Sequence, residues 1–99
     1  MAIGVQLDFK GATLAQYDEV LEATGYLPRG PSAATALFHW VTKTDDGIRI
    51  IDVWESRQAF DSFAGEADPG VFAQAGAPEP PVIQFFDIHN YLTGGRWRG

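Results

Sequence analysis

Cysteine is absent from the 99 residues of this chain, which excludes disulfide bonds, thiolate metal sites and cysteine nucleophiles. Long apolar runs are absent too, since none approaches the length needed to cross a bilayer. The first residues, MAIGVQ, lack the cationic segment and apolar stretch of a signal peptide. We therefore expect a cytoplasmic protein.

Basic residues are also scarce, with seven Lys and Arg against thirteen Asp and Glu and a formal net charge of −6. Proteins that bind nucleic acids or anionic membranes need clustered cations to neutralise phosphates. Here the bases are scattered, and only Arg96 and Arg98 lie close together. We therefore expect neither a nucleic acid nor a membrane as a partner.

Aromatic residues, by contrast, are plentiful, with three Trp, three Tyr and seven Phe. A chain of this length forms one domain, residues 1–99, and a small two-layer domain cannot easily bury so many large rings. The surplus favours self-association.

The periodicity of apolar residues and the positions of cap and turn residues predict six main elements. Thr13 and Gln16 have the spacing of a capping box, Gly25 stops the helix that follows, and Ser56 can cap a second helix. The predicted strands cover residues 3–9, 34–42, 48–54 and 82–92, the helices cover about 13–24 and 57–67, a short extra helix covers 68–75, and residues 93–99 form a polar tail.

The order β-α-β-β-α-β is the signature of a ferredoxin-like α+β sandwich, in which both helices pack on one face of a four-stranded antiparallel sheet. The turn at Asp45-Asp46-Gly47 decides which side chains share a face. A two-residue turn of Asp46 and Gly47 pairs His39 with Trp54. A three-residue turn with a bulge at Gly47 pairs Phe38 with Trp54 instead and turns His39 towards the helices.

We favour the two-residue turn, because it gives an entirely apolar layer under the helices. That layer comprises Phe38, Trp40, Ile51 and Val53, and the free face of the two strands comprises Leu37, His39, Val41, Ile50, Asp52 and Trp54. The free face should also carry Gln6 and Asp8 from the first strand. From the last strand it should carry Phe85, Asp87, His89 and Tyr91, because a charge beneath packed helices is costly unless it is paired.

A free face with this composition is too aromatic for solvent and too polar for an ordinary core. A second copy of the same sheet can cover it, and the enclosed space can remain as a cavity. The expected partners are therefore the chain itself, as a homodimer through the free face, and a small apolar or aromatic molecule.

The element order and the segment DVWESRQAF, residues 52–60, resemble the dimeric α+β barrel superfamily and most of all its antibiotic-biosynthesis monooxygenase branch. The resemblance implies two subunits whose sheets pack face to face, with a pocket in each. Some members oxidise aromatic polyketides with O₂ and need no metal or flavin, whereas others cleave haem. Asp52 stands where the family more often has Glu.

The haem-cleaving relatives combine a Trp at this signature with an Asn on the first strand and a His on the second helix. Trp54 matches the first residue, but the first strand of this chain has no Asn and its second helix has no His. The resemblance therefore implies oxygenase chemistry without haem, and we expect no cofactor.

A cofactor-free oxygenase needs a base that removes a proton from a phenol or enol, and an apolar enclosure where the anion meets O₂. The candidate catalytic residues are His39, Asp52 and His89, because imidazole changes its charge near neutral pH and a carboxylate can orient it. The candidate substrate-binding residues are Gln6, Asp8, Trp54, Phe85, Asp87 and Tyr91.

Three other interpretations stay open. The histidines and Trp54 can be hydrogen-bonded structural or interface residues. The fold can bind a small ligand without catalysis, or its free face can be filled solidly. Two imidazoles with a carboxylate could in principle hold a metal, but no short ligand spacing supports such a site, and we expect no metal.

Overall fold

Two helices and four strands follow the expected order in the described part of the chain, residues 2–26, 36–66 and 79–92 of a computed structural model. The elements are β1 (Ile3–Lys10), α1 (Leu14–Ala23), β2 (Ala36–Lys43), β3 (Gly47–Trp54), α2 (Arg57–Glu66) and β4 (Val82–Asp87). The predicted helix over residues 68–75 and the predicted tail over 93–99 lie outside the described residues.

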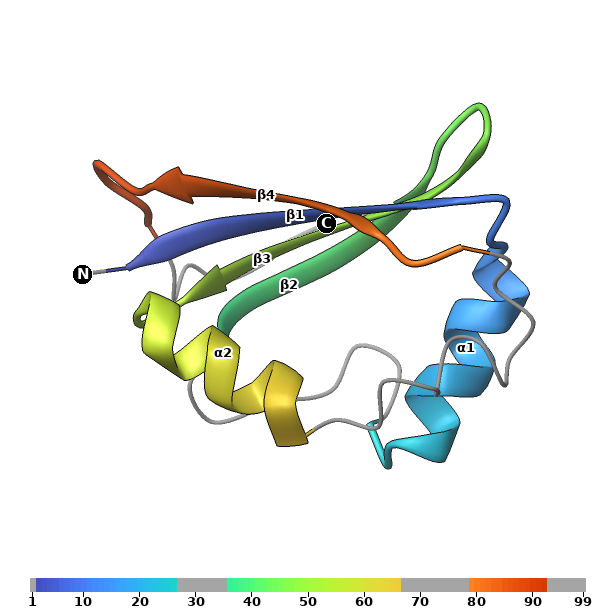
Figure 1. Cartoon of the computed structure of the whole chain (residues 1–99), viewed down its shortest axis with the longest axis horizontal. Helices are drawn as coiled ribbons and strands as arrows, with labels where there is room; N and C mark the ends of the chain where they lie inside the picture. Colours follow the sequence, from blue (N-terminus) through green and yellow to red (C-terminus); the bar gives the residue numbers. More distant parts are fainter. Residues whose placement is uncertain (1, 27–35, 67–78, 93–99) are drawn as a thin grey trace, which may run out of the picture.

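The strands form one antiparallel sheet in the order β2-β3-β1-β4. Both helices lie on the same side of this sheet, α1 near one end and α2 near the other (Figure 1). This confirms the ferredoxin-like α+β class. We call the side with the helices the helix-covered face and the other side the uncovered face.

The ends of both helices follow the signals in the sequence. Thr13 and Gln16 form a reciprocal capping box at α1, and Gly25 follows the helix with a φ of 85°, a conformation that glycine adopts without steric cost. The Ser56 hydroxyl accepts a hydrogen bond of 3.0 Å from the backbone N–H of Ala59, so that it caps α2.

The core consists of two apolar clusters, one under each helix. Under α1 the buried residues are Phe9, Ala12, Tyr17, Ile48 and Ile50, and under α2 they are Ile3, Val5, Trp54 and Phe60. Along β3, Ile50 belongs to the first cluster and Trp54 to the second. Asp52 lies between them on the same face, so a carboxylate sits where the two clusters meet.

The hairpin between β2 and β3 differs from both expected registers. The central pair of the turn is Asp45-Asp46, closed by a hydrogen bond of 2.9 Å from Thr44 N to Gly47 O, and His39 lies opposite Asp52. Gly47 is the first residue of β3, and a Cβ there would lie 2.0 Å from the carbonyl oxygen of Phe9. The glycine therefore serves the close approach of β1 and not the turn.

The expected assignment of the two faces was wrong for β2 and β3. The observed register is shifted by two residues, which keeps His39, Asp52 and Trp54 on one face. That face, however, is the helix-covered one, and Trp40 lies on the uncovered face with Phe38, Ile51 and Val53. The burial of Trp54 against α2 outweighs the cost of bringing Asp52 along, because the carboxylate is fully hydrogen-bonded.

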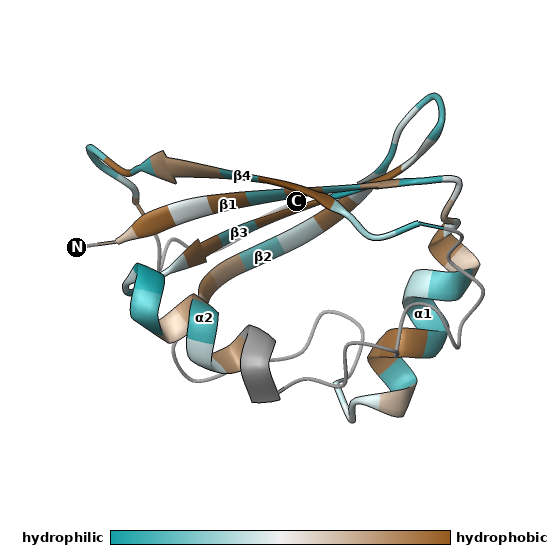
Figure 2. Cartoon of the chain, in the orientation of Figure 1, coloured by the Kyte–Doolittle hydropathy of each residue, from teal (hydrophilic) through white to brown (hydrophobic). Residues whose placement is uncertain are grey.

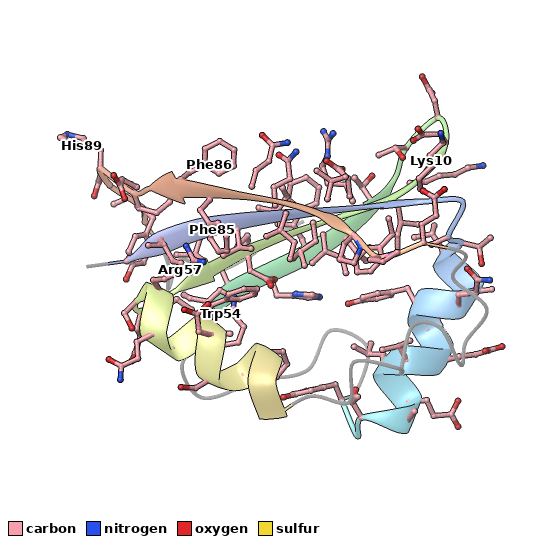
Figure 3. The ribbon with its side chains drawn as sticks, in the orientation of Figure 1. Lys10, Trp54, Arg57, Phe85, Phe86 and His89 are labelled. Atoms are coloured by element: carbon pink, nitrogen blue, oxygen red, sulfur yellow. The ribbon has the colours of Figure 1, made fainter. Side chains whose placement is uncertain are left out.

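The last strand was also assigned incorrectly. It ends at Asp87 and not near residue 92, so His89 and Tyr91 lie beyond the sheet. Phe85 points towards the helices and Phe86 away from them (Figure 3), and the ring of Phe85 meets Phe60 of α2 edge-on with centroids 5.6 Å apart. Aromatic packing thus decided which of two similar faces turns inward.

The uncovered face combines exposed rings with an ion pair. Phe38, Trp40 and Phe86 are 51%, 44% and 48% exposed, while Arg49 binds Asp8 with Nε 2.7 Å from Oδ1. Gln6 and Asp8 therefore lie on this face, as expected. Apolar residues recur along all four strands, whereas each helix alternates between polar and apolar positions (Figure 2). The sheet therefore has apolar residues on both faces.

Candidate active site

His39 and Asp52 form the centre of a polar cluster on the helix-covered face. They lie opposite each other on β2 and β3, and His39 Nδ1 is 2.5 Å from Asp52 Oδ1. Asp52 is buried, whereas the side chain of His39 keeps 32% of its surface exposed. A carboxylate that binds one imidazole nitrogen fixes the orientation and tautomer of the ring.

Trp54 binds the other oxygen of the Asp52 carboxylate. Its Nε1–H donates to Asp52 Oδ2 at 3.3 Å, and its ring packs against Phe60 and Phe63 of α2 at centroid distances of 5.8 and 5.0 Å. The indole is almost completely buried. In this structure Trp54 therefore holds the carboxylate and fills the core, and its faces are not open to a ligand.

Tyr17 of α1 completes the cluster, and the sequence analysis did not identify it. Its hydroxyl lies 2.6 Å from His39 Nε2, and the two rings are nearly parallel. Burial raises the pKa of Tyr17 above its ordinary value, and the nearby charges of Asp52 and Asp18 act in the same direction. A tyrosine within an apolar helical stripe was the available signal, because a buried Tyr hydroxyl needs a partner.

The cluster is therefore a hydrogen-bonded chain that runs from Tyr17 of α1 through His39 of β2 to Asp52 and Trp54 of β3. An ionised carboxylate only accepts, so His39 donates from Nδ1, and in the neutral imidazole Nε2 is then the nitrogen with the lone pair. Imidazole in this arrangement can take up a proton at Nε2, and the positive charge that results lies beside the carboxylate of Asp52.

The structure separates the other predicted site residues from this cluster. Gln6 and Asp8 lie on the uncovered face, on the opposite side of the sheet, where Gln6 donates to Asp8 at 3.0 Å. Asp87 at the end of β4, and His89 and Tyr91 beyond it, are exposed, and His89 projects from the far end of the strand (Figure 3). The expected single set is therefore divided between two faces and a chain end.

Besides Trp54, Phe85 is the predicted ligand contact that lies on the helix-covered face. The guanidinium of Arg57, at the start of α2, stands 3.6 Å from the centroid of its ring and also binds Asp61 one turn along the helix at 3.1 Å. Arg57, Phe85 and Trp54 lie on the same side of the sheet (Figure 3). This arrangement places a cation and the partly exposed ring of Phe85 beside the aromatic cluster under α2.

A half-open hollow of about 410 Å³ lies at the turns that join β1 to α1 and β2 to β3, lined by residues 11–14 and 43–48. None of the predicted site residues lines it. Among the described residues no group of three His, Asp or Glu is arranged to hold a metal ion, and no helix there is long and apolar enough to span a membrane.

Comparison with known proteins supports the architecture. The ferredoxin-like fold is similar to that of a solved structure over almost the whole chain. A similar solved structure is a monooxygenase from the gene ActVA-Orf6 of Streptomyces coelicolor, in complex with the ligand nanaomycin D. The match has a TM-score of 0.57 and 20% identity, and it covers 95% of this chain and 92% of the other. No family model and no curated protein matches the sequence.

Proposed function

We propose that this chain is a small cofactor-independent monooxygenase that oxidises an apolar, aromatic molecule on the helix-covered side of its sheet. The observation that carries the proposal is the pair of His39 and Asp52, 2.5 Å apart and joined to the buried Trp54. An imidazole that is oriented by a buried carboxylate, beside aromatic side chains, is the arrangement that a proton-abstracting site for a planar substrate needs.

The chemistry requires no group beyond the substrate, O₂ and a base. Loss of a proton from a phenol or enol gives an electron-rich anion, which transfers electrons to O₂ and forms a carbon–oxygen bond. When the activated carbon is a methylene, one oxygen atom becomes a carbonyl and the other leaves as water, so the substrate itself supplies all four electrons. The bound aromatic ligand of the Streptomyces monooxygenase supports a substrate of this class.

His39 is the proposed base and Asp52 its orienting partner, while Phe85 contributes an aromatic wall next to Arg57. His89 is the weaker candidate, because it lies beyond the end of β4 and is exposed there (Figure 3). This assignment makes the two histidines of the chain a natural pair for comparison.

The test measures O₂ uptake with a panel of planar phenols, such as naphthols and hydroxyanthrones, while tryptophan fluorescence reports binding. We expect His39→Gln to lower turnover by about 10²–10⁴-fold, and His89→Gln to leave it unchanged. If the wild-type chain binds none of these phenols and consumes no O₂, or if the two variants behave alike, the proposed function is wrong.

A second candidate function is ligand binding without catalysis. It is favoured by one observation, namely that both oxygens of Asp52 and both nitrogens of His39 already bind other members of the cluster. Such a site could be a rigid wall of a binding pocket. The same panel separates the two functions, because a binding protein would show fluorescence changes but no O₂ uptake at any pH.

The proposed assembly is a homodimer that buries the uncovered face against a second copy. Three exposed rings, Phe38, Trp40 and Phe86, lie on this face with the half-buried Ile51 and Val53, and apolar patches of this kind mark interfaces. Sedimentation at micromolar concentration should give a dimer. Trp40→Lys should give a folded monomer, whereas Leu14→Lys, which changes an exposed apolar residue of α1, should remain dimeric.

A further inference from the structure

Neither nitrogen of His39 is free to meet a substrate. Nδ1 is 2.5 Å from Asp52 Oδ1, and Nε2 is 2.6 Å from the hydroxyl oxygen of Tyr17. A base that acts directly must present its lone pair to the substrate within hydrogen-bond reach. In this structure the lone pair of Nε2 is already taken by a phenol of the chain itself.

The direction of each hydrogen bond follows from the chemistry of the three groups. The carboxylate can only accept, so Nδ1 carries a proton, and in the neutral imidazole Nε2 is then the acceptor. Tyr17 must therefore donate its O–H to Nε2, and its oxygen keeps lone pairs that can accept a proton from elsewhere. Burial and the nearby Asp52 raise the pKa of Tyr17, which keeps this hydroxyl protonated at neutral pH.

We propose that Tyr17 is the group that contacts the substrate hydroxyl and that it relays the substrate's proton to His39. The proposal rests on the function proposed above and changes its catalytic residue, because His39 then receives the proton without touching the substrate. Tyr17 is 8% exposed, so its hydroxyl is held in place by packing, while the side chain of its partner His39 keeps 32% of its surface exposed.

The relay breaks and forms equal numbers of bonds. The O–H bond of the substrate breaks and its proton binds the oxygen of Tyr17, while the original O–H bond of Tyr17 breaks and a new N–H bond forms at Nε2 of His39. Tyr17 is a neutral phenol before and after the step. Because the buried site disfavours a tyrosinate, the two transfers occur together, with no tyrosinate between them.

The products of the step are stabilised by the same residues. The imidazolium of His39 lies against the carboxylate of Asp52. The substrate oxyanion faces the new O–H of Tyr17, which can now donate to it, as a preorganised donor does at a developing negative charge. After the step the proton lies on His39 and the negative charge on the substrate oxygen, and the hydroxyl of Tyr17 lies between them.

The test uses 1-naphthol with the wild-type protein, Tyr17→Phe, and Tyr26→Phe as a control that removes a hydroxyl outside this cluster. At about pH 7 a phenol with an ordinary pKa of about 10 is neutral in water, and its phenolate absorbs at longer wavelength. We expect wild type and Tyr26→Phe to bind 1-naphthol as the phenolate, and Tyr17→Phe to bind it in the neutral form. Turnover of oxidisable phenols should fall by about 10²–10⁴-fold in Tyr17→Phe.

Each outcome decides between the alternatives. If Tyr17→Phe binds the phenolate and turns over as wild type does, or faster because Nε2 is freed, the relay is wrong while the oxygenase function stands. If Tyr17→Phe binds neither form and its circular dichroism spectrum is altered, His39→Gln takes its place in the test. This second variant must also shift bound 1-naphthol to its neutral form. If the wild-type protein neither ionises the probe nor consumes O₂, the proposed function fails and the relay with it.

Discussion

Replacing Asp52 by Asn changes the hydrogen-bonding pattern of the site while almost keeping its shape. The carboxylate accepts from His39 Nδ1 at 2.5 Å and from Trp54 Nε1 at 3.3 Å, whereas an amide has one acceptor and one donor. The buried Trp54 can only donate, so it keeps the oxygen. The NH₂ group then faces His39 Nδ1, and the bond survives only if His39 changes its tautomer.

The magnitude follows from this rearrangement. All bonds of the cluster can be kept, but two charge-assisted bonds become neutral ones, and each loses about 1 kcal/mol. We expect Asp52→Asn to lower the free energy of unfolding by about 2 kcal/mol, and Tm by about 8–16 °C in a chain of this size. In the new tautomer Nε2 carries the proton, so His39 cannot accept one, and a wrong tautomer costs about 10⁴-fold in a serine protease.

Two assays test this reasoning. Urea unfolding followed by circular dichroism, at one fixed protein concentration because of self-association, gives the change in stability. Nitrogen-15 NMR of the imidazole reports the tautomer: we expect a protonated Nδ1 in wild type and a protonated Nε2 in the variant. Asp61→Asn is the matched control, because its ion pair with Arg57 is exposed, and such pairs contribute about 0.5 kcal/mol or less. An unchanged tautomer in Asp52→Asn would refute the argument.

Three further outcomes test other parts of the structure. Gly47→Ala should lower the free energy of unfolding, measured in urea, by about 3 kcal/mol or more, because the new Cβ would overlap a backbone carbonyl of β1. Gly25→Ala should lower it by about 1–2 kcal/mol, for its positive φ alone. Similar costs of the two substitutions would contradict the placement of Gly47 in the strand. The hydrogen bond from Arg49 lowers the pKa of Asp8. The stabilisation that this ion pair gives the fold is therefore complete above the pKa of the unfolded state, about 3.9, and is lost as the pH falls through the pKa of the folded state. Arg49→Gln should remove that part of the acid sensitivity, and an identical acid profile would exclude the pair. The raised pKa of Tyr17 stabilises the fold fully below about pH 10 and less as the pH rises through the pKa of the folded state. The ultraviolet titration of Tyr17→Phe should therefore lose a tyrosine transition above about pH 10.

The positions of the elements were largely predictable because their signals are local. The alternation of β1, the capping box at Thr13 and the serine before α2 each act within four residues. The overall order of elements then limits the fold to few topologies. Local signals failed at β4, where apolar residues on both sides of the strand left its end and its inward face undecided.

The candidate site was predictable only in part. Asp52 and Trp54 are two residues apart, so they lie on the same face of β3. His39 lies on that face both in the expected register and in the observed one, because the two registers differ by two residues. Tyr17 was missed because, in a helical apolar stripe, a tyrosine counts as a core residue until something buried opposite it needs a hydroxyl. Its partner comes from a strand 22 positions away in the chain.

The sequence by itself therefore determined the elements, the fold class and the grouping of an imidazole, a carboxylate and an indole on one side of a sheet, because strand periodicity is a local property of the backbone. Only the tertiary structure decided that this side lies under the helices. The strands β2, β3 and β4 each offered apolar residues on both faces, and the choice depended on Phe60 and Phe63 of α2 packing on Trp54. The same packing carried Asp52 into the interior, where His39 and Trp54 could satisfy its charge.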